Sequence, residues 1–330
     1  MNLRILSAAD VRRAVTMAQA IQAVRQAYVQ LSRGQAVVPL RTPLPVEKRE
    51  AVTLFMPAYL ATSDAMAAKI VSVFPGNPAR GLPLIHAVVV VVDAETGQPA
   101  ALMDGTYLTA LRTGAASGVA TDLLARPEAR IAAIFGAGAQ ARTQLEAVCT
   151  VRPIEEAWVY DTDLAAAQVY AAEMAASGPP IPAKISVADS PTQAVANADV
   201  VCTATTSSRP VFDDADLKAG SHVNGIGAYT PQMQEVPAGT VARAKIVVDS
   251  RSASLAEAGD LLIPLEQGLI GEGDIHGEIG EVAAGLIPGR QSAEDITFFK
   301  SVGVAVQDVA VADLILRRAI EQDLGVEVDL

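Results

Sequence analysis

The stretch Arg130–Ala141 places the tightest constraint on how this chain can fold. The apolar run Ile131–Phe135 has the length of a buried strand, and Gly136-Ala137-Gly138-Ala139-Gln140-Ala141 follows it directly. In such a G-x-G-x-x-A pattern a strand turns tightly into a helix, and backbone N–H groups at the positive end of that helix face a pyrophosphate. The stretch therefore predicts a dinucleotide-binding turn at Gly136 and Gly138.

A carboxylate after the next strand-like run strengthens this prediction. The run Ala157–Tyr160 ends at Asp161, 23 residues after Gly138. At this spacing a carboxylate accepts hydrogen bonds from the adenosine ribose hydroxyls and repels a 2′-phosphate. We therefore expect NAD(H) to be favoured over NADP(H), with use of both left open. The alternative is a glycine-rich turn beside an ordinary surface aspartate.

Strand-like and helix-like segments alternate from Arg130 onward, which is typical of βαβ units and a parallel sheet. The predicted fold class is α/β, with a central Rossmann-type doubly wound sheet. Six strands are expected, at 131–135, 157–160, 184–187, 200–203, 222–225 and 245–248. Helices are expected between them at 141–148, 164–176 and 192–196.

The two ends of the chain follow a different pattern. Residues 8–33 carry apolar positions at helical spacing, with Gly34 as the stop. An extended region follows, broken by Pro39, Pro43, Pro45 and Pro57, with strands of one sheet expected at 54–56, 67–74 and 88–92. An amphipathic helix is expected at 107–124 with Arg112 and Thr113 in its first turn. A last helix at 304–322 is long enough to pack back on the first domain.

Composition excludes several classes of function. The 330 residues are 51% hydrophobic and 19% charged, which allows two globular domains. A net charge of −12 argues against nucleic acid and anionic membranes as partners. The start of the chain does not resemble a signal peptide, and Cys149 and Cys202 form no disulfide framework, so we expect a cytoplasmic protein. The three histidines lack metal-ligand spacing, so no metal is expected.

Three cations near segment ends are candidates for binding a substrate carboxylate. Arginine at 41 and 112 offers a planar fork that suits a carboxylate. Lys69 lies inside an apolar run, where a charge is costly unless it faces a cleft or a partner. The alternatives are a solvent-facing lysine on an edge strand, a helix-surface Arg112 and an Arg41 that is only a loop charge.

Small residues follow two of the predicted strands. Thr203-Ala204-Thr205 and Gly225-Ile226-Gly227 lie at the carboxyl ends, where open α/β sheets bind ligands. We expect Thr203, Thr205, Gly225 and Gly227 to line a cofactor site, and tight turns without a ligand are the alternative.

Together these pieces resemble the ornithine cyclodeaminase and μ-crystallin family, whose members bind a nicotinamide cofactor. The resemblance spans nearly the whole chain in the family's order. Its segments are Lys69–Val71, Asn77–Pro83, Leu108–Ser117, Gly136–Ala141, Asp274–Gly280 and Ser301–Gly303.

The resemblance implies a homodimer with two domains. Residues 1–112 and 303–330 would form a substrate-binding and dimerisation α+β domain, and 113–302 the dinucleotide-binding domain. Arg41, Lys69 and Arg112 would contact the carboxylate of an imino or amino acid, with Lys69 as the catalytic residue. Val302 would border the substrate, and Ser301 the nicotinamide. The remaining cofactor contacts implied are Arg112, Thr113, Ala139, Gln140, Asp161 and Thr203.

One loop differs in sequence from the corresponding loop of the cyclodeaminases. They carry an aspartate that acts on the substrate amine, whereas this chain reads Gly225-Ile226-Gly227-Ala228-Tyr229-Thr230-Pro231. Neither Ala228 nor Tyr229 is a carboxylate base at neutral pH. This form resembles members that reduce cyclic ketimines such as Δ1-pyrroline-2-carboxylate and Δ1-piperideine-2-carboxylate, giving L-proline or L-pipecolate. An ornithine cyclodeaminase, an alanine-dehydrogenase-like enzyme and a non-catalytic binding protein of the μ-crystallin type are the alternatives.

Overall fold

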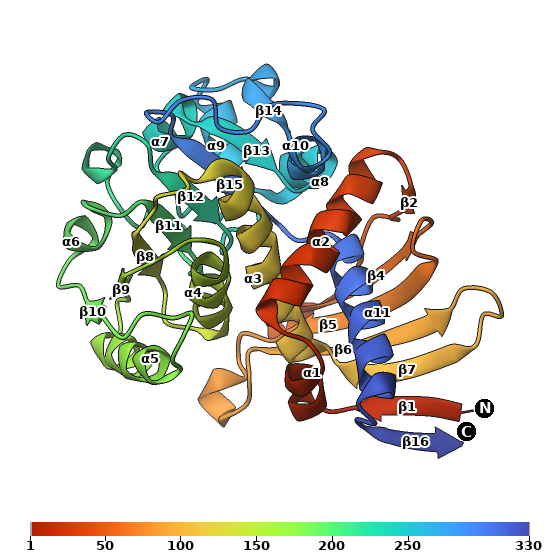
Figure 1. Cartoon of the computed structure of the whole chain (residues 1–330). Coiled ribbons are helices and arrows are strands. Elements are labelled where there is room, and N and C mark those ends of the chain that lie inside the picture. The colour runs from red at the N-terminus through yellow and green to blue at the C-terminus, as the bar shows by residue number, and fades with distance from the viewer. Residues whose placement is uncertain (1, 330) are drawn as a thin grey trace. The chain divides into compact units, whose positions relative to one another are not determined.

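The structure is a computed structural model that describes residues 2–329. The chain divides into two compact units (Figure 1). Unit 1 comprises Met1–Arg112 and Val304–Leu330, and unit 2 comprises Thr113–Gly303. Both ends of the chain thus contribute to unit 1, where β1 and β16 pair antiparallel. The assignment of unit 1 to dimerisation stays a prediction.

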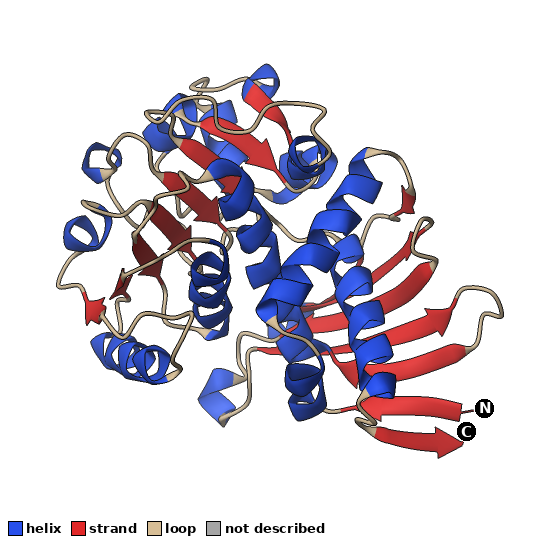
Figure 2. Cartoon of the chain, viewed as in Figure 1, coloured by secondary structure: helices blue, strands red, loops and turns tan. Residues whose placement is uncertain are grey.

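Unit 1 is built on one mixed sheet, drawn in red in Figure 2. The strand order is β16-β1-β7-β6-β5-β4-β2, and β3 pairs with β4. The strands are β1 (Asn2–Leu6), β2 (Ala36–Val37), β3 (Thr42–Val46), β4 (Ala51–Leu60), β5 (Ala65–Val73), β6 (Ile85–Asp93), β7 (Pro99–Asp104) and β16 (Val326–Asp329).

Helices α1 (Ala8–Ala14), α2 (Met17–Ser32) and α11 (Ala305–Glu321) pack on this sheet (Figure 1). The single helix expected over 8–33 is wrong, because Val15 adopts extended backbone and ends α1. Thr16 then caps α2 through a capping box with Gln19. The apolar positions kept helical spacing across this break, so the pattern alone did not reveal it.

The prolines do not interrupt the strands as expected. Pro43 and Pro45 lie within β3, which pairs only with β4. Residues two apart in a strand direct their nitrogens to the same side, so a free edge tolerates both. Pro57 lies inside β4, between the residues that pair with β3 and those that pair with β2. On this side of β4 it therefore removes no donor that β2 or β3 uses, and on the other side it lies opposite Ala68 of β5.

Helix α3 (Gly105–Leu124) differs from its prediction in two ways. Its residues from Leu108 to Thr121 are all buried, so the helix is not amphipathic. Arg112 and Thr113 lie two turns inside it rather than in the first turn. The Ala-rich composition let the helix be buried on all sides, which periodicity could not show.

Unit 2 is built on one parallel sheet with eight strands, not six. Their order is β10-β9-β8-β11-β12-β15-β13-β14. The strands are β8 (Ile131–Phe135), β9 (Glu156–Tyr160), β10 (Ile185–Val187), β11 (Val200–Thr203), β12 (His222–Gly225), β13 (Lys245–Val248), β14 (Ile275–Glu278) and β15 (Thr297–Lys300). The chain reverses its direction of travel across the sheet between β8 and β11, which is where doubly wound sheets bind ligands.

The two strands absent from the prediction have only four residues each. β15 inserts between β12 and β13, with Thr297 opposite His222 and Lys300 opposite Gly225. Its polar ends, Thr297 and Lys300, hid it from a pattern based on apolar runs. The other missed strand, β14, contains His276.

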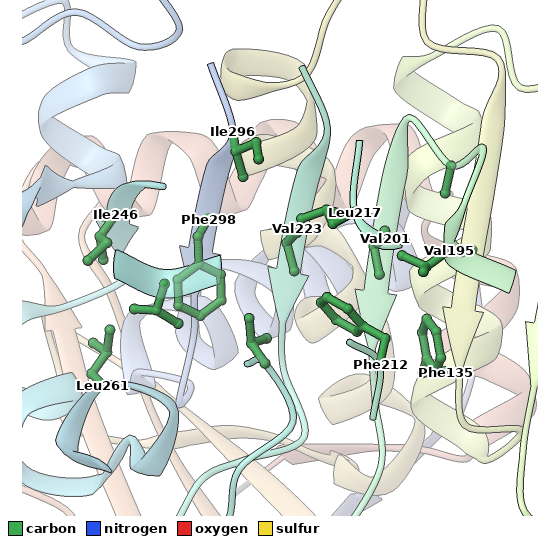
Figure 3. Close-up of a cluster of buried hydrophobic side chains, with 14 of the residues drawn as sticks. Phe135, Val195, Val201, Phe212, Leu217, Val223, Ile246, Leu261, Ile296 and Phe298 are labelled. Carbon is green, nitrogen blue, oxygen red and sulfur yellow. The ribbon is translucent and has the colours of Figure 1, made fainter. Parts of the chain in front are cut away.

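Helices cover both faces of this sheet. Alternate residues of β8 point to opposite faces: Phe135 joins the cluster shown in Figure 3, and Ile134 joins a second cluster on the other face. The helices of unit 2 after α3 are α4 (Ala139–Val151), α5 (Leu164–Ala176), α6 (Pro191–Val195), α7 (Ala238–Arg243), α8 (Arg251–Glu257), α9 (Gly259–Glu266) and α10 (Ile279–Ala283). Within residues 2–329, no helix has the length and apolarity needed to cross a membrane.

Candidate functional site

The turn between β8 and α4 has the features of a pyrophosphate site. Gly136 has φ +100°, and a Cβ there would lie 2.7 Å from the Ala204 carbonyl oxygen, so only glycine fits. At Gly138 a Cβ would meet no protein atom within 4 Å, so packing within the chain does not explain this glycine. Gly138 is also the N-cap of α4 and offers no side chain to its first N–H groups. Both features leave room and donors for an anion.

Asp161 lies at the end of β9 and is tied to this turn. Its Oδ2 accepts a hydrogen bond from the Ala137 N–H at 2.8 Å, and its Oδ1 accepts one from the Asp163 N–H at 2.9 Å. The side chain is half-buried. The carboxylate is therefore fixed beside the glycine turn, and its other lone pairs stay open to a ligand.

Two predicted cofactor residues at the start of α4 have different surroundings. Ala139 is the first residue of the helix and is exposed. Gln140 is half-buried, and its Oε1 atom is buried with no hydrogen-bond partner. A buried, unpaired carbonyl oxygen beside a cofactor turn fits a site completed by a bound group. Thr113 is buried within α3.

The loops after β11 and β12 are held together by a carboxylate that the sequence prediction missed. Oε1 of Glu235 accepts from the amide and hydroxyl of Thr205, at 2.6 and 2.7 Å. Its Oε2 accepts from the Thr203 hydroxyl at 3.0 Å and from the amides of Gly227 and Ala228 at 2.6 and 3.0 Å. Five donors from two loops therefore converge on one fully buried side chain.

This arrangement changes how the predicted residues can serve a cofactor. The hydroxyl hydrogens of Thr203 and Thr205 are both donated to Glu235. A Cβ at Gly227 would lie 2.1 Å from the Thr205 carbonyl oxygen, which explains that glycine by loop packing alone. At Gly225 a Cβ would lie 2.7 Å from the Phe298 ring. These four residues therefore shape the loops. A contact with a cofactor would use their backbone, the threonine methyl groups, or a threonine hydroxyl oxygen as acceptor.

A buried ion pair lies next to Glu235. Asp260 Oδ1 accepts from the amides of Glu235 and Val236 at 2.7 and 3.0 Å, and its Oδ2 lies 2.9 Å from Lys300 Nζ. Asp260 and Lys300 are both fully buried. Burial and the neighbouring Asp260 charge raise the pKa of Glu235. Lys300, at the end of β15, pairs with Asp260, and its charge opposes the rise in the pKa of Glu235.

Ser301 and Val302 are fixed by a third buried carboxylate. Asp249 follows β13, and its Oδ2 accepts from the Ser301 hydroxyl at 2.7 Å and from the amides of Val302 and Gly303 at 3.0 and 2.8 Å. The Ser301 amide also donates to the Gly225 carbonyl. Burial raises the pKa of Asp249 although these bonds oppose it. The predicted nicotinamide-flanking segment is therefore anchored by its backbone.

The cations predicted for substrate binding lie together in unit 1. Lys69 is on β5, an interior strand of the sheet, and is 1% exposed, so the alternative of a solvent-facing lysine on an edge strand is wrong. Asp308, on the first turn of α11, accepts from Lys69 Nζ at 2.8 Å and from Arg112 Nε at 3.0 Å, both at Oδ1. Arg112 is 7% exposed, so it is not a helix-surface residue. Two buried cations thus share one carboxylate oxygen.

A hydrogen-bonded chain extends from this cluster to α2. Arg112 Nη1 donates to Gln307 Oε1 at 2.5 Å, and Gln307 Nε2 donates to the Tyr28 hydroxyl. Gln307 and Tyr28 are fully buried. The guanidinium plane is therefore fixed by two consecutive residues of α11.

Burial and the neighbouring charges change the pKa of Lys69. Burial lowers its pKa to about 8, and the charge of Arg112 acts in the same direction, whereas Asp308 opposes both. The Arg41 charge also lowers the pKa of Lys69, which places Arg41 near the same group. Arg41 itself is half-buried in the loop before β3. A lysine with this pKa holds its proton at neutral pH and can still release it.

The histidines lie apart from these groups. His222 is buried between Thr297 and Asn224, and burial lowers its pKa to about 3. His276 contacts the Pro288 carbonyl, and His86 is exposed. Among residues 2–329, no three His, Cys, Asp or Glu side chains are grouped as metal ligands.

The residues missed by sequence reasoning are Asp249, Asp260, Glu235, Lys300 and Asp308. Asp249 and Lys300 end short strands, as Asp161 does, and this position could have drawn attention to them. Glu235 and Asp260 bond to loops far from them in sequence, which only the fold reveals.

A protein-family model matches nearly the whole chain. The model of the "Ornithine cyclodeaminase/mu-crystallin family" matches residues 1–323. The chain belongs to this family.

Among its relatives is the Delta(1)-pyrroline-2-carboxylate reductase of Bacillus cereus, 38% identical over 98% of this chain and 99% of the relative. The structure of the Thermococcus litoralis Delta(1)-pyrroline-2-carboxylate reductase in complex with NADH and L-proline is similar, with 43% identity and a TM-score of 0.95 over 99% of this chain and 100% of the other. An archaeal alanine dehydrogenase dimer with bound NAD has 37% identity and a TM-score of 0.92, each chain covered completely. The family resemblance thus extends across both units.

Proposed function

We propose that this protein is an NAD(P)H-dependent ketimine reductase that converts Δ1-pyrroline-2-carboxylate to L-proline, and Δ1-piperideine-2-carboxylate to L-pipecolate. The observation that carries this proposal is the pair Lys69 and Arg112, two buried cations that share one oxygen of Asp308. One carboxylate does not neutralise two cations, so the cluster favours a second anion. The carboxylate of a cyclic imino acid supplies that charge, and the similar reductases act on such compounds.

The residues of unit 1 would hold the substrate. Arg112 presents its guanidinium in a fixed plane, which suits a carboxylate. Lys69 donates a hydrogen bond to that carboxylate or passes a proton to the imine nitrogen, and its pKa near 8 suits either role. Arg41 adds charge from the neighbouring loop.

The residues of unit 2 would hold the cofactor. Gly136, Gly138 and the first amides of α4 would bind the pyrophosphate, and Asp161 the adenosine ribose. The empty space at the Gly138 Cβ position and the unpaired Oε1 of Gln140 support this assignment. Bound NADH supplies the hydride that reduces the C=N carbon. Ser301 and Val302, with the loops after β11 and β12, would keep the nicotinamide in place.

The absence of an acid in the loop Gly225–Pro231 favours imine reduction over deamination. Cyclic imines can bind already protonated, so the reaction depends on positioning and on the carboxylate clamp rather than on a strong base. Ornithine cyclodeamination needs a group that acts on the substrate amine, and Ala228 and Tyr229 do not provide a carboxylate.

The decisive experiment follows NADH absorbance with the purified protein and Δ1-pyrroline-2-carboxylate. Ornithine with NAD⁺ is run in parallel and assayed for ammonia. Loss of NADH absorbance supports ketimine reduction, whereas ammonia release without it would reject the proposal in favour of a cyclodeaminase. Binding of NADH without turnover of either substrate would favour a non-catalytic binding protein.

Oxidation of alanine is a second candidate activity, because the similar archaeal alanine dehydrogenase aligns over the whole chain. The test is NAD⁺ reduction with L-alanine, compared with NADH oxidation by the cyclic imine. A higher kcat/KM for alanine would make the amino acid the preferred substrate.

We also propose that the protein is a homodimer, formed through the sheet face of unit 1 opposite α11. In β5, Lys69 and Val71 alternate with Ile70, and Ile70 lies on that opposite face. Phe55 on β4 and Val88 on β6 are its direct neighbours in register. A broad face of half-exposed apolar side chains is typical of a protein interface.

Light scattering coupled to size-exclusion chromatography tests this proposal. Ile70→Glu places a charge in the apolar face and should yield monomers. Val326→Glu on β16, where the valine is 64% exposed, is the matched control and should leave the dimer intact. A monomeric wild-type protein would reject the homodimer.

A further inference from the structure

The carboxylate of Asp308 is used on one side only. Oδ1 accepts hydrogen bonds from Lys69 and Arg112, whereas Oδ2 is buried and has no hydrogen-bond partner. The side chain is 1% exposed. Leaving a buried polar atom unpaired is unfavourable, and more so for a charged group, so we expect this oxygen to receive a hydrogen bond from a bound ligand.

The other buried carboxylates of the chain differ from Asp308. Asp199, Glu235, Asp249 and Asp260 each receive protein donors at both oxygens. Among the described residues, Oδ2 of Asp308 is the one buried carboxylate oxygen left without a donor. The chain therefore satisfies the carboxylates that anchor loops and leaves an acceptor open beside the cation cluster.

The chemistry of the proposed substrate supplies the missing donor. A cyclic imine accepts hydride as its protonated form, which carries an N–H on a positive nitrogen, and the product amine carries N–H groups at the same atom. The carboxylate on the adjacent carbon needs cations, and the nitrogen needs an anionic acceptor. Lys69 and Arg112 provide the first, and an open oxygen of Asp308 provides the second within the same cluster.

We propose that Asp308 recognises the substrate nitrogen: its Oδ1 holds the Lys69 and Arg112 cations, and its Oδ2 accepts the N–H of the bound imine or amine. This inference rests on the proposed function, because it assigns a partner to the nitrogen of that substrate. Asp308 takes the place of the acid that the loop Gly225–Pro231 lacks. Its negative charge stabilises the cationic imine without removing a proton from carbon.

The site selects for ligands that combine a carboxylate with a neighbouring N–H. A compound of the same shape in which ring oxygen replaces N–H keeps the interaction with the cations and loses the interaction with Oδ2. Discrimination between two such compounds therefore measures Oδ2 alone, because both compounds use the Lys69 and Arg112 clamp equally.

The test compares L-proline with (S)-tetrahydrofuran-2-carboxylate as ligands of the wild-type protein in the presence of NADH, measured by calorimetry. L-proline should bind at least tenfold more tightly. In Asp308→Asn this ratio should fall to threefold or less, even where both ligands weaken. Asp313→Asn is the matched control, because Asp313 lies on the same helix and pairs with Arg317 at the surface; it should keep the wild-type ratio.

Several outcomes would overturn the proposal. Equal binding of the two ligands by the wild type does so without any variant, which covers the case that Asp308→Asn fails to fold. If Asp308→Asn keeps the wild-type ratio of the two affinities, another group binds the substrate nitrogen. If the wild type binds neither ligand, the cation cluster is not a binding site for such carboxylates. Failure of the proposed function is distinct, because it is the absence of NADH oxidation with Δ1-pyrroline-2-carboxylate.

Discussion

Glu235 binds Thr205 twice through one oxygen atom, since Oε1 accepts both the Thr205 amide at 2.6 Å and its hydroxyl at 2.7 Å. The second oxygen faces the amides of Gly227 and Ala228. Backbone amides cannot accept hydrogen bonds, so each oxygen of Glu235 has a donor that tolerates only an acceptor. The two loops at the carboxyl ends of β11 and β12 therefore depend on a carboxylate here.

Glu235→Gln should disturb both loops. Whichever way the amide turns, its NH₂ group faces a backbone N–H, which should cost about 2–4 kcal/mol and lower the melting temperature by roughly 5–15 °C. The KM for NADH should rise more than the KM for the imine. Glu266→Gln, at an exposed position of α9, is the control for both measurements. An unchanged melting temperature in Glu235→Gln would contradict the role of this carboxylate.

Asp161→Asn should relax the choice between cofactors. The single oxygen of asparagine can still accept the Ala137 amide, which keeps the glycine turn. The bond from the Asp163 amide and the charge that repels a 2′-phosphate are lost. We expect the ratio of kcat/KM for NADH to that for NADPH to fall at least tenfold, about 1.4 kcal/mol. Asp163→Asn, which replaces one good N-cap of α5 with another, should leave the ratio unchanged. A wild-type preference for NADPH would reject the ribose assignment.

Arg112→Ala should weaken substrate binding while the protein stays folded. A charge-assisted hydrogen bond contributes about 1.5–3 kcal/mol, so the KM for the imine should rise roughly 10- to 150-fold. Arg112→Lys keeps the charge but loses the planar guanidinium that contacts both Asp308 and Gln307. Its KM for the imine should therefore lie between that of the wild type and that of Arg112→Ala. Arg318→Ala removes an exposed ion pair and serves as control. Unchanged kinetics in Arg112→Ala would exclude Arg112 from the site.

The sequence was most predictive where one local rule governs the structure. The turn at Gly136 and Gly138 follows from strand-to-helix geometry, and the acidic end of β9 from a fixed spacing. Lys69 was left between two interpretations, because a charged residue in an apolar run shows that the charge needs a partner or solvent but does not show which. The partner of Lys69 is Asp308, 239 positions away in the sequence.

The remaining features depend on long-range pairing. The four residues of β15 form a strand because β12 and β13 lie on either side of them. The residue pattern of Thr297–Lys300 has no periodicity that predicts a strand. Lys300 is buried there because Asp260 compensates its charge. The break between α1 and α2 was missed for the opposite reason, since the apolar spacing continues across Val15 and only the capping box at Thr16 marks it.

His222 should make the stability of the protein depend on pH. Its pKa is lowered from 6.5 to about 3 in the folded chain, because the ring is buried. Between these values the unfolded chain binds one proton more than the folded chain, so stability falls as the pH drops from 6.5 toward 3, by about 1.4 kcal/mol per pH unit. The contribution is fully present above pH 6.5.

Melting temperatures of the wild type and of His222→Gln between pH 4.5 and 7.5 test this dependence. The variant loses the ring and its contacts with Thr297 and Asn224, so it should be less stable at pH 7.5. The difference in melting temperature between the two proteins should narrow as the pH falls. Only in the wild type does unfolding expose a histidine that then binds a proton, so only the wild type loses stability for this reason. His86→Gln should follow the wild-type curve, since His86 is exposed. A gap of constant size would mean that His222 is protonated equally in both states.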